Sequence, residues 1–392
     1  MRLGKEYRLD RMSIRSTKIR ILILAAIYSP PYSGAGYMAQ LLKDSVFAEA
    51  FDLLHINTRF VDSVSDLETI NFSKFVLFIK YLWLLSAALL TRRPDFVIIC
   101  PAFSKGAFLK DSIYTLVCSA LFRRRVIWWA HALGLRRLYD RSGPLMRRYL
   151  RWVVTSVCRI VTVGYRQRSD YDFICSREQV FTIYHGVPAM EFSRNRYEGR
   201  QDIRVLYFSN LEATKGWTIL LEAAKQICVC RDGVIFDFYG NSAKGTSKQS
   251  IEEAFQSSGF PDRICYHGPA YGVAKHQAYY TADIFCFPTY FPVETFGLVN
   301  LEAMNAGLPV ISTDQANIPE IIHDGRGGFL VPREDSAALS TAILRLVDDG
   351  ELRRRMGEYN RQRFYEHFTV DKFVARWIEF IQSLAAANGE SG

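Results

Sequence analysis

The sequence predicts an α/β protein made of two parallel sheets, each packed between helices. Short apolar segments alternate with longer stretches of helical periodicity, and this alternation is typical of doubly wound parallel sheets. The pattern occurs twice, and a polar stretch without clear periodicity, residues 191–200, separates the two series. At 392 residues, the chain is long enough for each half to form its own core. We therefore expect two Rossmann-like halves.

Each expected strand is a short run rich in apolar residues. The first series contains Ile19–Ile27, Phe96–Cys100, Val126–Ala130 and Ile160–Val163. The second contains Arg204–Tyr207, Val234–Tyr239, Arg263–His267, Ile284–Phe287 and Val310–Ser312. Helical periodicity lies between the strands, for example at Tyr37–Leu42 and Lys110–Phe122, and a last helix is expected at Lys372–Leu384.

Neither of two apolar segments predicts a membrane span. A basic start precedes Ile21–Ile27, but this run is short and a Gly/Pro loop follows it. We interpret it as the first buried strand and not as a signal peptide. The other segment, Phe75–Leu90, has about sixteen residues and is interrupted by Lys80. It is shorter than the ~20 residues that a bilayer requires, so we expect no transmembrane helix.

Composition indicates a globular protein with reduced cysteines. Hydrophobic residues make up 49% of the chain and charged residues 23%, which excludes a disordered polymer. The eight cysteines lie mostly inside apolar runs and form no Cys-x-x-Cys pair. This argues against structural zinc and thioredoxin-type chemistry and favours the cytosol.

Residues 287–320 carry the most chemical information. Gly297 can open a helix that ends at Gly307, where glycine tolerates the left-handed cap conformation. The free N–H groups and the dipole at the start of such a helix favour a phosphate. Glu294 lies just before this start, and Glu302 lies roughly 7.5 Å along the helix from Gly297. That distance is about the step from a diphosphate to an attached ribose.

The string FPVETFGLVNLEAMNAGLPVIST, followed by IPEII, resembles the two-glutamate donor-binding signature of family 4 retaining glycosyltransferases. The two glutamates, the Phe296–Gly297 pair between them, the Gly307–Pro309 turn and Pro319–Glu320 agree in order and spacing. Weaker similarity extends from about Ile19 to the final helix. The resemblance implies the GT-B fold, in which two Rossmann-like domains face a central cleft and the C-terminal helix crosses back. Within this family the chain looks like the bacterial cell-surface polysaccharide type.

The resemblance also implies a division of the chain. We expect a flexible basic extension at 1–18, an acceptor domain at 19–190 and a nucleotide-sugar donor domain at 191–368. Residues 369–392 would form the helix that returns to the N-terminal domain and a flexible tail.

In the resembled family, the second domain binds the donor. The resemblance implies that Lys215 and the N–H groups of Gly297, Leu298 and Val299 contact the diphosphate, and that Glu302 holds the ribose. Asn210 stands five residues before Lys215, where the family has an arginine. Asparagine offers a neutral hydrogen bond in place of a charge-assisted fork. Either another residue, such as an N-terminal arginine, replaces it, or donor binding is weaker.

A glycine-rich loop follows the first strand. Gly34 and Gly36, with Ala39 in the third position, loosely fit the pattern GxGxxG/A. This match is too short to predict a dinucleotide site, but such a loop lets N–H groups approach an anion closely. In similar enzymes it faces the donor phosphates or the acceptor. An ordinary turn with flexible glycines is the alternative.

Two residues are candidates for catalysis. His131 follows Val126–Ala130 at the carboxyl end of that strand, where open α/β sheets bind ligands. The resembled family often has a histidine here, close to the transferred sugar. The resemblance therefore implies that His131 and Glu294 act on the sugar at the reaction centre. A structural role for His131 is the alternative, and we interpret His185 as a turn residue.

Basic residues concentrate in the stretch Arg123–Trp152. The whole chain has a formal net charge of +9, and this stretch mixes arginines with leucines and aromatic residues. Nucleic acid binding and a simple solvated face are both possible uses of such a surface. Because no nucleic-acid-binding module accompanies the stretch, we favour attraction to an anionic membrane surface.

Taken with these observations, the resemblance implies a retaining, metal-independent hexosyltransferase in cell-envelope glycan synthesis. It would transfer a sugar from a UDP- or GDP-linked donor to a lipid-linked or glycan acceptor, on the cytoplasmic face of the cell membrane. No Asp-x-Asp metal clamp is evident, so neither a metal nor a bound cofactor is expected. The alternatives are a nucleotide-sugar epimerase of the same fold and a non-catalytic membrane-surface scaffold. The base, sugar, acceptor, linkage and oligomeric state are not specified by these patterns.

Overall fold

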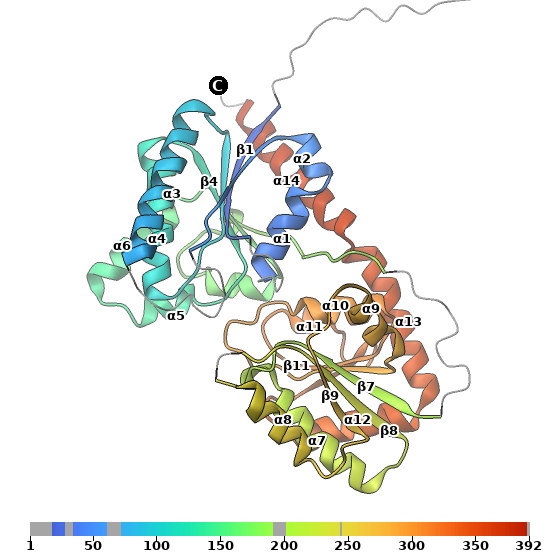
Figure 1. Ribbon diagram of the computed structural model, residues 1–392. Helices are drawn as coiled ribbons and strands as arrows, with labels where there is room; N and C mark the ends of the chain where they lie inside the picture. Colours follow the sequence, from blue (N-terminus) through green and yellow to red (C-terminus); the bar gives the residue numbers. More distant parts are fainter. Residues whose placement is uncertain (1–17, 28–33, 61–71, 191–200, 244, 390–392) are drawn as a thin grey trace, which may run out of the picture.

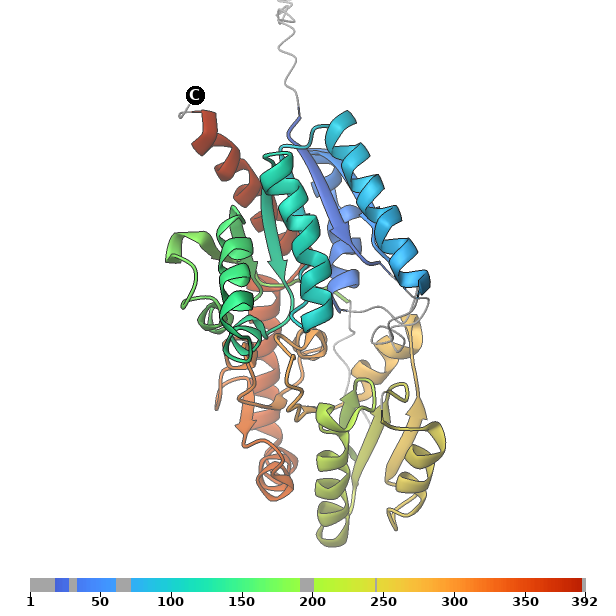
Figure 2. The ribbon, with the colours of Figure 1, turned by 90° about the vertical axis from the view of Figure 1, so that its left-hand side faces the viewer.

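The computed structural model describes residues 18–27, 34–60, 72–190, 201–243 and 245–389, and it shows two α/β halves (Figures 1 and 2). Each half is built on a six-stranded sheet, with the orders β2-β1-β3-β4-β5-β6 and β12-β11-β10-β7-β8-β9. Every neighbouring pair of strands in both sheets is parallel. The doubly wound architecture predicted from the sequence is confirmed.

The strands are short, and most are buried. Those of the first sheet are β1 (Arg20–Ala25), β2 (Asp52–Asn57), β3 (Phe96–Ile99), β4 (Arg125–Ala130), β5 (Arg159–Thr162) and β6 (Val180–Thr182). Those of the second are β7 (Ile203–Phe208), β8 (Val234–Tyr239), β9 (Ile264–Gly268), β10 (Ile284–Phe287), β11 (Val310–Thr313) and β12 (Gly328–Val331).

Three strands were not expected from the sequence, namely β2, β6 and β12. All three lie at the edge of a sheet. β2 contains Asp52, His55 and Asn57, and β6 has only three residues. Since an edge strand has a neighbour on one side only and is often partly exposed, it lacks the continuous apolar run that identified the central strands.

Helices cover both faces of the first sheet. On one face lie α3 (Phe72–Thr91), α4 (Lys105–Leu116) and α6 (Pro144–Thr155), and a π-helix at Val117–Leu121 continues α4. On the other lie α1 (Gly34–Lys43), α2 (Val46–Ala50) and α14 (Val370–Gly389). The short helix α5 (Leu135–Asp140) follows β4.

The C-terminal helix α14 packs on the N-terminal half, as expected. Its side chains Phe373, Trp377 and Phe380 are buried in one cluster with Ile21 and Ile23 of β1. Figures 1 and 2 show this helix, in red, leaving the C-terminal half and running along the first sheet. The two halves are thus held together by more than their linker.

Helices also enclose the second sheet. They are α7 (Trp217–Cys230), α8 (Lys248–Gln256), α9 (Gly272–Thr281), α10 (Leu298–Asn305), α11 (Ile318–Ile321), α12 (Ser336–Asp348) and α13 (Gly350–His367). In Figure 1, α9, α10 and α11 lie on the side that faces the N-terminal half. The loops at the carboxyl ends of both sheets therefore approach each other.

The length predicted for the apolar segment before β3 was wrong. Helix α3 has 20 residues, not sixteen, and its mean hydropathy reaches 1.6. By length and composition it could cross a membrane, so the length argument against a span fails. One of its faces, formed by Tyr81, Leu85 and Leu89, is nevertheless buried in the core of the N-terminal half.

Several expectations fall on residues that the structure does not describe. They concern residues 1–17 of the N-terminal extension, the polar stretch 191–200 and residues 390–392 of the tail. The flexible tail was expected at Asn388–Gly392, but Asn388 and Gly389 belong to α14. The domain limits at residues 18, 190 and 368 stay predictions.

Candidate active site

Helix α10 begins as expected, at a glycine that no other residue could replace without strain. Gly297 has φ +66°, and a Cβ atom there would lie 2.8 Å from Nδ2 of Asn300. At the other end, Gly307 has φ +67° and terminates the helix. The first N–H groups of a helix have no carbonyl partner within it. One of them, the N–H of Gly297, donates to Oε1 of Glu294 at 3.1 Å.

Glu294 and Lys215 form an ion pair at this helix start. The Nζ of Lys215 lies 2.7 Å from Oε2 of Glu294, and the two side chains are only 19% and 12% exposed. The ammonium group also lies 4.7 Å from the centre of the Phe291 ring. The sequence suggested that Glu294 acts on the sugar and Lys215 on the diphosphate, whereas in the structure the two side chains bind each other.

The loop that carries Lys215 is fixed by close packing. Gly216 has φ +83°, and a Cβ atom on it would come within 2.1 Å of the Pro288 carbonyl oxygen. The N–H of Tyr290 donates to the Thr214 carbonyl at 2.8 Å. The loop after β7 therefore lies directly against the loop after β10, and this contact brings Lys215 to Glu294.

Asn210 lies in the same loop, but it takes no part in the ion pair. Its side chain is exposed, and its backbone carbonyl accepts a hydrogen bond from the Tyr207 hydroxyl at 3.3 Å. The first described arginine, Arg20, does not replace the missing one, because it lies at the amino end of β1 near Asp52 and Asp95. The arginines before residue 18 are outside the described residues.

Glu302 has two partners that the sequence analysis missed. Its Oε1 lies 2.5 Å from Nζ of Lys275, and its Oε2 accepts a hydrogen bond from the Tyr279 hydroxyl at 2.9 Å. Burial, with a smaller contribution from the Glu302 charge, raises the pKa of Tyr279 well above its ordinary value. Lys275 and Tyr279 are four residues apart on α9, so they share one side of that helix. This spacing is the signal that could have identified them together.

His131 is in contact with the C-terminal half, but its ring is buried. The Thr295 hydroxyl donates to the His131 carbonyl at 2.7 Å. The imidazole lies 4.3 Å from the Trp129 ring and is stacked at 5.1 Å on His185. Burial lowers the pKa of His131 to about 3, and neither ring nitrogen has a hydrogen-bond partner among the described residues. A neutral imidazole with two unused polar atoms is suited to hydrogen bonding and poorly suited to taking up a proton.

His185 is part of the same cluster and is more than a turn residue. It is 4% exposed and lies 5.3 Å from the Phe296 ring. Burial, and to a lesser extent His131, lower the pKa of His185 well below its ordinary value. Phe296, which lies between the two glutamates, thus packs on His185 of this histidine pair.

The glycine-rich loop of the first half meets the start of α10. A Cβ atom on Gly34 would lie 3.9 Å from Cδ1 of Leu298. Gly34 and Leu298 are the first residues of α1 and α10, so the amino ends of two helices approach each other here. Gly36, two residues further along α1, is buried, and Val299 follows Leu298 in the first turn of α10. Residues 28–33 of the loop are outside the described residues.

A second contact joins the halves beside this site. The Glu320 carboxylate accepts hydrogen bonds from the N–H of Tyr165 at 2.8 Å and from the Tyr184 hydroxyl at 2.9 Å. Asn317 accepts another from the N–H of Gln167 at 2.9 Å. A Cβ atom on Gly164 would collide with Asn317 at 2.2 Å. The Pro-Glu pair noted in the sequence therefore lies at the domain interface.

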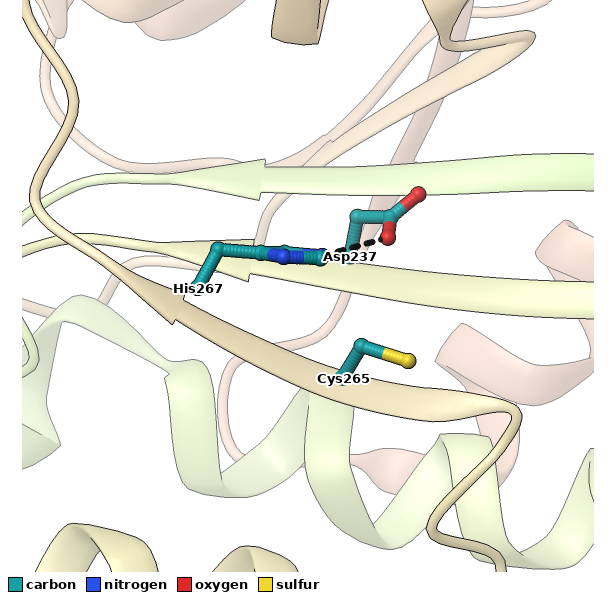
Figure 3. Close-up of side chains that lie close together, drawn as sticks. All are labelled: Asp237, Cys265 and His267. Carbon is teal, nitrogen blue, oxygen red and sulfur yellow. Dashed lines mark hydrogen bonds and ion pairs between the residues drawn. The ribbon is translucent and has the colours of Figure 1, made fainter.

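Among the described residues, one group has side chains of the metal-ligating type (Figure 3). His267 lies 2.7 Å from Oδ1 of Asp237, and Cys265 is close by on the same strand, β9. Arg204 already pairs with the other oxygen of Asp237 at 2.9 Å. Burial, followed by the Asp237 charge, raises the pKa of Cys265 and so disfavours the thiolate that metal binding requires. We therefore assign the group to an ion-pair network that joins β7, β8 and β9.

The sequence does contain one Asp-x-Asp triplet, Asp170–Asp172, which corrects the statement that none is evident. Its first carboxylate accepts hydrogen bonds from the backbone N–H groups of Gly134, Leu135 and Arg136, at 2.8 to 3.1 Å. Asp170 therefore caps the start of α5, which is a structural role.

Comparison with protein families and curated proteins is informative for the C-terminal half. Residues 190–363 match the family model of glycosyl transferases group 1. Over 144 residues, 37% of each chain, the protein is 35% identical to a phosphatidyl-myo-inositol mannosyltransferase of Mycobacterium leprae. Over 269 residues it is 27% identical to an MMP alpha-(1->4)-mannosyltransferase of Mycolicibacterium hassiacum, covering 66% of this chain and 61% of that protein. These matches span less than two thirds of each relative.

Solved structures are similar over nearly the whole chain. A sucrose-phosphate synthase from Thermosynechococcus elongatus has a TM-score of 0.75 at 18% identity, covering 94% of this chain and 100% of that one. HepE of Anabaena, in complex with UDP and glucose, has a TM-score of 0.69 at 17% identity, covering 93% and 100%. At this identity the likeness shows the fold, which is GT-B. Residues 190–363 thus resemble a glycosyl transferases group 1 domain, in a chain that has the GT-B fold.

Proposed function

We propose that the chain is a retaining, metal-independent hexosyltransferase that uses a UDP- or GDP-linked sugar and a lipid-linked or glycan acceptor. The observation that carries the proposal is the convergence at the start of α10. There, the Glu294 carboxylate lies within hydrogen-bond distance of both the Lys215 ammonium group and the N–H of Gly297. The group 1 domain match supports this assignment, since it covers all three residues.

The donor diphosphate binds at the amino end of α10. The helix dipole, the N–H groups of Leu298 and Val299, and the Lys215 ammonium stabilise its charge, which grows as the sugar departs. Glu302 accepts hydrogen bonds from the ribose hydroxyls, and Lys275 limits the repulsion between this carboxylate and the phosphates. The 2.5 Å contact between Lys275 and Glu302 supports that second role.

The transfer exchanges one bond at the anomeric carbon for another. The bond to the diphosphate oxygen breaks and its electrons leave with the diphosphate, while the acceptor hydroxyl oxygen bonds to the same carbon. Burial lowers the pKa of His131 to about 3, and both oxygens of the Glu294 carboxylate are engaged, by Lys215 and by the N–H of Gly297, so neither residue is suited to accept the acceptor proton. The acceptor proton therefore passes to the leaving diphosphate oxygen. This requires attack on the face that the leaving group occupies, which accounts for retention.

Glu294 and His131 orient the sugar by hydrogen bonds to its hydroxyls. His131 can do so as a neutral imidazole that both donates and accepts. A membrane-proximal acceptor is supported by the basic stretch Arg123–Trp152 in the N-terminal half, and the proposed location is the cytoplasmic face of the cell membrane.

The decisive experiment supplies UDP- and GDP-hexoses with a pool of lipid and glycan acceptors, with and without a chelator. Mass spectrometry should detect a hexosylated acceptor whose yield is unchanged by the chelator, and NMR of the first product should show a retained anomeric configuration. An isomerised donor that forms without acceptor would indicate an epimerase. If the donor stayed unreacted and the protein nevertheless bound vesicles, it would be a non-catalytic scaffold. An inverted product, or activity lost to the chelator, would refute the corresponding part of the proposal.

A further inference from the structure

Helix α3 has an exposed apolar stripe on the side opposite its buried face. Phe72, Phe75, Val76, Ile79 and Trp83 are 80%, 59%, 50%, 47% and 68% exposed. Their spacing of three or four residues places them along one side of the helix. Large exposed apolar side chains that gather in this way are unusual on a monomer and mark an interaction surface.

The stripe continues across the two neighbouring helices. Helices α3, α4 and α6 form one layer over the first sheet, and Figure 1 shows them side by side. On α4, Leu109 and Ile113 are 40% and 38% exposed. On α6, Leu145 and Trp152 are 87% and 54% exposed. We refer to these nine residues of α3, α4 and α6 as the apolar face.

The exposed charges on the three helices that form the apolar face have a single sign. Helices α3 and α6 contain no Asp or Glu, and the only acidic residue of α4, Asp111, is 5% exposed and pairs with Lys110 at 2.7 Å. The exposed charged residues of the three helices are instead cations, such as Lys80, Lys105 and Arg148. A surface that combines large apolar side chains with cations alone complements anionic lipid headgroups above acyl chains.

We propose that the apolar face inserts into the interface of an anionic bilayer, with α3 lying in the membrane plane. This extends the membrane docking in the proposed function by adding an apolar, salt-resistant component, and it does not depend on the transfer chemistry. Although α3 is long enough to span a bilayer, its buried face is part of the core that covers one face of the first sheet. A spanning orientation would remove Tyr81, Leu85 and Leu89 from that core.

The apolar face is less suited to binding a second copy of the chain than to binding a membrane. A symmetric dimer through this face would bring the same patch against itself. The cations of both copies would then meet without exposed acidic residues on these helices to neutralise them. A lipid headgroup layer supplies the opposite charge.

The test compares a stripe variant with a matched control. Phe75→Ser, Ile79→Ser and Trp83→Ser together replace three of the five stripe residues, and these side chains are 59%, 47% and 68% exposed, so folding should be retained. The control, Val229→Ser with Val273→Ser, changes side chains that are 78% and 84% exposed in the C-terminal half. Binding is measured by cosedimentation with phosphatidylglycerol-containing vesicles and with phosphatidylcholine vesicles, at low salt and at about 1 M salt, where charges are screened over about 3 Å.

We expect wild type and control to keep a measurable part of their anionic-vesicle binding at high salt, and the stripe variant to lose at least tenfold of it. Equal binding by all three proteins would overturn insertion. If charge reversal of the arginines abolished binding at every salt concentration, insertion would also be overturned. The docking would then be electrostatic alone. The face would be assigned to a second copy of the chain if wild type did not bind vesicles but formed a concentration-dependent dimer, and if only the stripe variant failed to form it.

Tryptophan fluorescence gives an independent readout. Of the six tryptophans, Trp128, Trp129, Trp217 and Trp377 are at most 4% exposed, so Trp83 and Trp152 report on the surface. Lipids with brominated acyl chains should quench the wild-type fluorescence, and Trp83→Phe should remove much of that quenching. Quenching that is identical in Trp83→Phe would show that α3 does not enter the acyl region.

Discussion

Lys215 and Glu294 neutralise each other at the position where the proposed donor places its phosphates. Both side chains are mostly buried, so their interaction is screened less than that of a surface pair. A diphosphate that enters must share the ammonium group with the carboxylate. The two residues should therefore affect binding in opposite directions, although they lie 2.7 Å apart.

Replacing each member of the pair tests this arrangement. Lys215→Ala leaves the Glu294 charge beside the phosphates, and we expect nucleoside diphosphate affinity to fall at least tenfold, or about 1.4 kcal/mol. Glu294→Gln frees the lysine, so affinity should be kept or raised while turnover falls strongly, because the lost contact is to the sugar. Calorimetry and initial rates measure the two effects.

Glu302→Ala provides a comparison within the same site. It should also weaken the nucleotide at least tenfold, since a hydrogen bond to a charged group contributes about 1.5–3 kcal/mol. Unchanged affinity in both Lys215→Ala and Glu302→Ala would remove the donor assignment. A loss of nucleotide affinity in Glu294→Gln as large as that in Lys215→Ala would contradict the opposing roles.

The buried histidine pair makes stability depend on pH. The folded-state pKa of His131 is about 3 and that of an unfolded histidine about 6.5, so below pH 6.5 the unfolded state binds more protons. The free energy of unfolding should therefore decrease as pH falls from 6.5, by up to about 1.4 kcal/mol per pH unit for each such histidine. His131→Gln should flatten this slope between pH 6.5 and 5.

Denaturant titrations at several pH values provide the measurement, and His276→Gln is a suitable control because it changes a histidine outside the pair. If wild type and His131→Gln have the same slope, the imidazole is not buried in solution. Turnover gives a separate answer. Near-wild-type turnover in His131→Ala with the native acceptor would make this residue structural.

At the scale of elements, α11 connects the two halves through Glu320 and Asn317. Their partners lie in the short 3-10 helix Arg166–Asp170 and in the residues just before it. The Glu320 carboxylate has two oxygens that accept separate hydrogen bonds, and each lies against the N-terminal half. This contact should hold the relative orientation of the halves and with it the distance between His131 and Glu294.

Two changes of different kinds test the α11 contact. Glu320→Gln removes the charge and one acceptor, while Gly164→Ala inserts a methyl group 2.2 Å from Asn317. We expect both to increase the radius of gyration in small-angle scattering and to lower turnover more than nucleotide affinity. Glu351→Gln, an exposed residue paired with Arg354 on α13, is the control. Scattering curves identical to wild type in both variants would show that the contact does not hold the halves.

At the scale of the whole molecule, charge is distributed unevenly. The arginines of Arg123–Trp152 lie on the N-terminal half, but they are not equivalent. Arg136 pairs with Asp140 at 3.3 Å, and Arg147 donates to the Tyr139 and Asp140 carbonyls at 3.0 and 2.8 Å. Arg137 and Arg148 are exposed and make no side-chain hydrogen bond or ion pair with the described residues.

Replacing Arg136, Arg137, Arg147 and Arg148 with Glu should abolish binding to anionic vesicles and leave nucleotide binding intact. Because Arg136 and Arg147 also support α5, Arg137→Glu with Arg148→Glu is the cleaner test. At about 1 kcal/mol for each basic residue near the surface, the double variant should lose at least tenfold of its low-salt binding. Equal partition of wild type onto neutral and anionic vesicles would leave the arginines as a solvated face.

The sequence by itself determined the architecture and part of the candidate site. Central strands such as β3 and β4 are buried on both faces, so an unbroken apolar run identified them. Gly297 and Gly307 could be placed at the ends of α10 because a positive φ restricts the choice of residue. The order of Glu294, Gly297 and Glu302 is local, and a family resemblance can detect it within one segment.

Only the tertiary structure decided which side chains meet. Lys275 of α9 reaches Glu302 of α10, and Lys215 reaches Glu294, because segments distant in the sequence meet beside the second sheet. His131 and His185, which follow β4 and β6 of the first sheet, stack on each other. The tertiary structure also decided which side of α3 is covered, since that helix has apolar residues on both its buried and its exposed sides, and its periodicity does not distinguish the two. Local patterns record the conformation of a segment, whereas contacts between distant segments depend on strand order and on the packing of the halves.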